Sequence, residues 1–71
     1  MPTIDVVYIG KKLRGQREQR FMNQEEFGEL VGLSKDHVGR LERNEHEPHF
    51  STIKKIADRL GIEPSELVDR A

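Results

Sequence analysis

The sequence predicts an all-α fold, a compact domain of five short helices, from three observations. Apolar residues recur at the three- and four-residue spacing of one helix face, as in Phe27, Leu30 and Val31. Residues that cap helices stand before such runs, and the glycines Gly32 and Gly61 follow them. The chain has 71 residues, of which 34% are hydrophobic, so it suffices for one thin core and not for two.

The first predicted helix runs from about Val6 to Arg20 and follows an N-terminal arm at residues 1–5. Asp5 can cap this helix, and Ile9 and Leu13 then face inward, one helical turn apart. The residues at its start are β-prone, so an extended conformation there is the alternative.

The second predicted helix begins after Asn23, which is a good N-cap. Glu26 stands three residues later, where the partner of a capping box belongs. Gly28 lies inside this helix, where glycine costs roughly 1 kcal/mol relative to alanine. A close crossing with another helix would explain that loss. Gly32 ends the helix, because glycine reaches the left-handed conformation without strain.

The third predicted helix begins after a very short turn. Ser34 is its N-cap, and Val38 and Leu41 form a narrow apolar stripe along it. Asn44 can take the left-handed conformation that ends a helix. So short a turn suits two helices that cross steeply, as in a helix-turn-helix.

The remaining chain predicts two more helices after a polar loop. Phe50 is expected to anchor the returning chain in the core, and His49 or Ser51 to cap a fourth helix of about Thr52–Leu60. Pro64 suits the first turn of a short fifth helix. The inward residues are expected to be Ile53, Ile56, Ala57, Leu60, Ile62 and Leu67.

Residues 24–43 resemble the helix-turn-helix of the Cro and phage-repressor-like DNA-binding family (the XRE type). The similarity extends in order over about 60 residues, which makes it specific. Its other landmarks are Ile9-Gly10-Lys11-Lys12-Leu13-Arg14, Arg17, Asn23, Leu41-Glu42-Arg43-Asn44, Pro48, Thr52-Ile53, Lys55-Ile56-Ala57, Leu60-Gly61-Ile62 and Glu66-Leu67-Val68. The resemblance implies a lambda-repressor-like fold for residues 6–71, in which Arg17 pairs internally with Glu42. A solvated Arg17 is the alternative.

The resemblance also implies a bacterial or phage-type transcriptional regulator that binds double-stranded DNA. With the apolar stripe of the third helix inward, its other face enters the major groove. The base-reading candidates on that face are Lys35, Asp36, His37, Gly39 and Arg40. The phosphate-binding candidates, at the start of the second helix and at the two ends of the third, are Asn23, Gln24, Ser34, Arg43 and Asn44.

The charge distribution opposes tight non-specific DNA binding. The net charge is −1, and residues 23–50, which include the reading region, carry three basic and seven acidic side chains. Glu45 and Glu47 stand where relatives often have basic residues, which weakens the loop–phosphate contacts expected there. This balance leaves a second hypothesis open, a helix-turn-helix-like module that binds protein. Against it, the outward face of the third helix is small and charged rather than apolar.

A homodimer on a palindromic operator is expected, because one helix in one groove reads only a few base pairs. The interface candidates are the C-terminal residues Ile62, Pro64, Leu67 and Val68. The alternative is that all four cover the core of the monomer.

Other chemistry has little support in the sequence. There is no cysteine, and the three histidines lack the spacing of a metal site, so no metal or cofactor is expected. No nucleophile elbow or phosphate-cradling glycine loop occurs, so we expect no enzyme. Neither a membrane segment nor a small-molecule ligand is expected, and a cytoplasmic, nucleoid-associated protein fits this composition.

Overall fold

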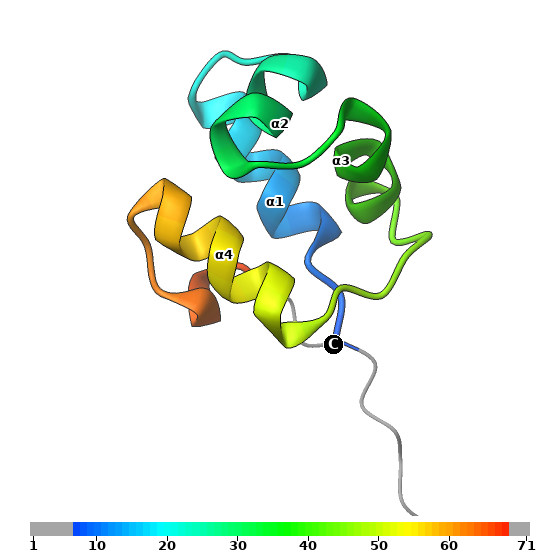
Figure 1. The fold of residues 1–71 in the computed structure, drawn as a ribbon, viewed down its shortest axis with the longest axis vertical. Helices are drawn as coiled ribbons and strands as arrows, with labels where there is room; N and C mark the ends of the chain where they lie inside the picture. The colour runs from blue at the N-terminus through cyan, green and yellow to red at the C-terminus, as the bar shows by residue number, and fades with distance from the viewer. Residues whose placement is uncertain (1–6, 69–71) are drawn as a thin grey trace, which may run out of the picture.

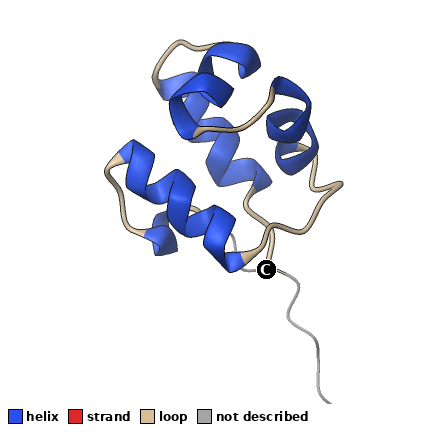
Figure 2. Cartoon of the chain, in the orientation of Figure 1, coloured by secondary structure: helices blue, strands red, loops and turns tan. Residues whose placement is uncertain are grey.

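The computed structural model describes residues 7–68, and in this range the chain forms four α-helices and one short 3₁₀ helix (Figure 1). These elements are α1 (Gly10–Gln19), α2 (Gln24–Val31), α3 (Lys35–Glu42), α4 (Phe50–Leu60) and η1 (Pro64–Glu66). Within the same range Figure 2 shows helices and loops without a strand. The all-α expectation is therefore confirmed, whereas the expected count of five α-helices is wrong.

The core forms where α1 packs against α3, α2 packs against both α3 and α4, and η1 closes over α4. Figure 1 shows α1 behind the other helices, in the centre of the molecule. Eleven apolar side chains are buried, and they come from the four α-helices and from the segments that flank α1 and η1: Ile9, Leu13, Phe27, Val31, Val38, Leu41, Ile53, Ile56, Ala57, Leu60 and Leu67. Periodicity predicted all eleven as inward-facing, whereas Ile62, which was also expected inward, is only partly buried.

The helix-turn-helix has the local structure that its capping residues predict. Asn23 accepts from the Glu26 N–H and Glu26 reaches back to the Asn23 N–H, which completes the capping box. Gly32 has φ +79° and turns the chain between α2 and α3. Gly28 has no room for a side chain, because a Cβ there would lie 2.5 Å from the Leu33 carbonyl oxygen. A close approach is therefore present, but it is made by the turn after α2 and not by another helix, as had been expected.

Helix α1 begins at Gly10, later than the expected Val6, and the alternative of a non-helical start is correct for the described residues Val7 and Tyr8. A tertiary contact sets the boundary. The Gly10 N–H donates to Asn44 Oδ1 at 3.1 Å, and a Cβ at residue 10 would collide with the last carbonyls of α3. The arm at residues 1–5, with its Asp5 cap, lies outside the described residues.

Helix α4 also departs from expectation at its start. It begins at Phe50 rather than Thr52, and His49 is its N-cap residue without a side-chain hydrogen bond. Phe50 was expected in the core, yet it is 72% exposed. Pro48 is buried instead, so the proline returns the chain to the core and Phe50, as the first residue of the helix, is left outside.

The C-terminal segment contains one 3₁₀ turn in place of the fifth α-helix. Pro64 opens the turn, and Glu66 accepts from the Glu63 N–H at 2.9 Å, which satisfies the start of the turn locally. Leu67 ends the turn and is fully buried. Burial of this one side chain requires only a single turn, which explains why the segment does not extend into an α-helix.

Candidate nucleic-acid interface

Helix α3 presents a polar surface because its apolar residues hold it to the core. Val38 and Leu41 are buried, and Ser34 caps the helix by accepting from the His37 N–H at 3.1 Å. Three of the expected base readers, Lys35, Asp36 and Arg40, are exposed. His37 is half-buried, since its ring meets the ring of His46 edge to face at 5.3 Å.

The exposed charges of α3 are partly paired with one another. Arg40 Nε lies 3.1 Å from Asp36 Oδ2, one helical turn away, and both side chains are more than half exposed. This pair orients the guanidinium along the first turns of α3. Lys35 lies outside that pair at the very start of the helix.

Gly39 lies on the outer face of α3, but it is buried there and does not project into solvent as expected. It is buried beneath two side chains, because a Cβ there would lie 2.9 Å from Arg43 Nη1 and 3.4 Å from Gln24 Oε1. The missing side chain creates a small hollow of about 260 Å³ between the start of α2 and the outer face of α3. Its lining residues are Gln24, Lys35, Asp36, Gly39 and Arg43.

Two of the expected phosphate contacts, both exposed, have side chains that cap backbone N–H groups of the protein itself. The Asn23 side-chain oxygen accepts from the Glu26 N–H at 2.8 Å, within the capping box. The Asn44 side-chain oxygen accepts from the Gly10 N–H and so faces α1. Sequence periodicity could not show the second contact, because it joins residues 34 positions apart.

An ion pair between Arg17 and Glu42 lies beneath this surface. Arg17 Nε donates to Glu42 Oε2 at 2.7 Å and Nη2 donates to Oε1 at 3.1 Å, while Nη1 donates to the Met22 carbonyl. The pair expected from the resemblance is thus present. Its hydrogen bonds to Glu42 raise the pKa of Arg17 above its ordinary value. Gln24 Nε2 also donates to Glu42 Oε1 at 3.2 Å, so the pair positions a side chain of the hollow.

A second Arg–Glu pair lies at the end of α3, and it was not predicted from the sequence. Arg43 Nε donates to Glu45 Oε2 at 2.8 Å and Nη2 donates to Oε1 at 3.2 Å. The hydrogen bond with Arg43 lowers the pKa of Glu45, and the same contact raises the pKa of Arg43. The available signal was Asn44 itself, because a left-handed residue brings its two neighbours together.

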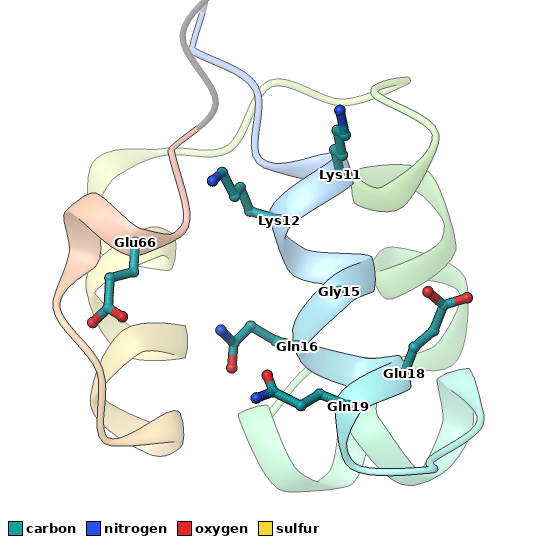
Figure 3. A pocket seen from close by; sticks show the side chains of 7 residues that line it. All are labelled: Lys11, Lys12, Gly15, Gln16, Glu18, Gln19 and Glu66. Atoms are coloured by element: carbon teal, nitrogen blue, oxygen red, sulfur yellow. The ribbon is translucent and has the colours of Figure 1, made fainter.

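Two further grooves lie outside the expected DNA contacts. One, of about 820 Å³, is open and lies between α1 and η1. In Figure 3, Lys12, Gln16 and Gln19 of α1 point toward the η1 side, which carries Glu66. An apolar groove of about 400 Å³ includes Pro64 and Val68 of the expected dimer surface. Leu67 is buried and is not available there, which corrects its assignment to that surface.

Metal binding finds no support among residues 7–68, where no three potential ligands cluster. His37 and His46 meet as a ring pair, while His49 precedes α4. None of the helices in this part of the chain combines the length and the apolar character that a membrane span requires.

Comparison with known proteins agrees with this geometry. A family model described as Helix-turn-helix matches residues 13–67. The immunity repressor protein of Bacillus phage phi105 is 30% identical over 60 residues, a match that covers 84% of this chain and 42% of that protein. The chain thus spans less than half of that repressor's length.

Two solved structures share the fold. The restriction-modification controller protein C.AhdI from Aeromonas hydrophila is 37% identical with a TM-score of 0.74, over 83% of this chain and 86% of that one. The P22 c2 repressor, solved in complex with a synthetic operator, is 26% identical with a TM-score of 0.75, over 87% of this chain and 94% of that one. The chain belongs to the Cro and phage-repressor-like helix-turn-helix family.

Proposed function

We propose that this protein is a sequence-specific DNA-binding transcriptional regulator that places α3 in the major groove. One observation carries the proposal: the polar hollow that joins the start of α2 to the exposed face of α3. Such a surface offers backbone and side-chain donors to a phosphate beside side chains that can reach base edges. The similar P22 c2 repressor was solved with an operator, which supports the same use of the fold. Such a regulator would act on the nucleoid, in the cytoplasm.

Base reading falls to the exposed side chains of the first turns of α3. Lys35 and Arg40 can donate to guanine O6 and N7, and Asp36 can accept from cytosine N4. The Asp36–Arg40 pair keeps these two side chains adjacent, so we propose that they read neighbouring bases. His37 can reach a base edge or a phosphate. Gly39 shapes the hollow and reads no base itself.

Phosphate binding falls to the rim of the hollow. The N–H groups at the start of α2 and its dipole favour an anion there, and Gln24 is held in position by Glu42. Arg43 bounds the opposite side. Ser34 can add a contact while it caps α3, whereas Asn23 and Asn44 act as caps.

The test is selection of binding sites from random duplex DNA, followed by Arg40→Ala. Loss of the guanidinium should cost about 1–3 kcal/mol at one base pair and relax the preference there. Arg59→Ala is the matched control, because it removes an exposed guanidinium from the C-terminal end of α4. A uniform loss over all sequences would make Arg40 a phosphate contact instead. If no motif is enriched at low salt, the protein-binding alternative replaces this proposal.

We further propose that the regulator binds a pseudo-palindromic operator as a homodimer, with half-sites about 34 Å apart. The proposed interface is the mainly apolar groove with Ile62 nearby in the chain, and its lining residues are Val7, Glu47, Pro48, Phe50, Ile53, Pro64, Ser65 and Val68. Phe50 is 72% exposed, so a hydrophobic ring stands at this groove without a core role.

The dimer is tested by Phe50→Ser, which should shift sedimentation to the monomer and weaken operator binding. Phe21→Ser is the control. Phe21 is 96% exposed and belongs to the α1–α2 loop, which Figure 1 shows at the end of the molecule away from the start of α4. Unchanged sedimentation and DNA binding by the Phe50 variant would contradict this interface.

A further inference from the structure

The pair formed by Arg43 and Glu45 has an unusual local origin. Residues two positions apart do not face each other on a helix. Here Asn44, between them, has φ +57° and reverses the chain just after α3. The Asn44 N–H bonds to the Leu41 carbonyl at 3.2 Å and the Glu45 N–H to the Arg40 carbonyl at 2.9 Å. This double closure is a Schellman motif, which fixes the backbone of Glu45 against the helix end.

The same geometry places the pair on the DNA-facing surface proposed above. Arg43 lines the hollow together with Gln24 and Gly39, and its Nη1 lies over Gly39. Its Nε and Nη2 both donate to Glu45, in a two-pronged contact. These are the donors with which a guanidinium holds two oxygens of a phosphate. The carboxylate therefore uses the atoms that a DNA phosphate would use.

We propose that Glu45 occupies Arg43 in the free protein in place of a DNA phosphate, so that DNA binding exchanges one anionic partner for the other. This inference rests on the proposed DNA-binding function. Glu45 is then an affinity-determining residue of the interface. It lowers affinity because Arg43 must be released from Glu45 before it can hold a phosphate.

The exposure of the pair makes the exchange feasible. Both side chains are 54% exposed, and exposed ion pairs contribute little to folding because water and salt screen them. Breaking the pair therefore leaves the fold intact. The lowered pKa of Glu45 agrees with a carboxylate that is charged and engaged at neutral pH.

The experiment compares Glu45→Gln with Glu47→Gln on a non-specific duplex over a range of salt concentrations. Each substitution removes one negative charge from the same exposed loop. Glu45 forms an ion pair with Arg43, whereas Glu47 forms none with the described residues. Glu45→Gln should tighten binding by about two- to fivefold, the range set by an exposed ion pair. The dependence of log affinity on log salt should steepen by up to about 0.9, the value of one phosphate contact. Glu47→Gln should have a smaller effect on both.

The decisive step repeats both substitutions in an Arg43→Gln background. The advantage of Glu45→Gln over Glu47→Gln should then disappear, because Arg43 is no longer there to be released. Equal effects of the two substitutions in the parent chain would overturn the inference and leave DNA binding intact. The inference also fails if the advantage persists without Arg43. A parent chain that binds no duplex at low salt would overturn the proposed function itself and the inference with it.

Discussion

Two arginine–glutamate pairs involve the C-terminal end of α3, and their geometry is nearly the same. Arg17–Glu42 has donor–acceptor distances of 2.7 and 3.1 Å, and Arg43–Glu45 has 2.8 and 3.2 Å. Their surroundings differ, because the first pair is 16% and 4% exposed and the second is 54% exposed on both sides. The exposure of each pair to water therefore decides its role, because the hydrogen bonds are nearly the same in both.

The buried pair ties together distant parts of the fold. It joins α1 to α3 across 25 residues, and it also binds the Met22 carbonyl and the Gln24 side chain. Removal of one partner would leave the other as a largely buried charge without its counter-charge. The exposed pair joins residues two positions apart, and either partner alone can be hydrated. One pair supports the structure, whereas the other is available for exchange.

Glu42→Ala tests most directly whether the buried pair contributes more to stability than the exposed pair. We expect a loss of roughly 3–5 kcal/mol in the free energy of unfolding, because Arg17, only 16% exposed, would lose its counter-charge and keep only its hydrogen bond to the Met22 carbonyl. In so small a domain that loss can prevent folding. Chemical denaturation measures it, with Glu45→Ala as the control that should leave the denaturation midpoint almost unchanged. Equal midpoints for the two variants would show that burial does not separate the pairs.

A smaller effect is expected from Arg17→Lys, which keeps the charge and loses the planar fork. The ammonium group cannot reproduce the three hydrogen bonds to Glu42 and Met22, so we expect a loss of about 1–3 kcal/mol. Arg14→Lys is the control, since Arg14 forms an exposed pair with Glu18. If both substitutions shift the melting temperature equally, the geometry of the buried pair is unimportant.

The smallest effect concerns pH and the exposed pair. The Glu45 pKa is lowered in the folded state, so the pair contributes to stability above the ordinary carboxyl pKa and this contribution is lost as pH falls through the lowered value. Arg43→Ala should raise the pKa of Glu45 toward its ordinary range, which NMR titration of the carboxyl carbon can measure. A Glu45 pKa that does not move would mean that the pair is absent in solution.

Local features of the structure were predictable because they depend on neighbouring residues. The capping box of Asn23, the left-handed Gly32 and the Ser34 cap each follow from residues at most three positions apart. The inward stripes of the helices follow from periodicity in the same way. The buried pair was predictable only through the resemblance to a family, since no local rule joins Arg17 to Glu42.

The sequence by itself therefore determined the helices, their caps and the face that each turns to the core. Tertiary structure alone decided where α1 begins, because the Gly10 N–H finds its acceptor on Asn44. It also decided that Gly39 lies under Arg43 and that Leu67 is buried rather than free for a partner. Helix periodicity and capping are local energies, whereas these outcomes depend on which surfaces meet once the chain has packed.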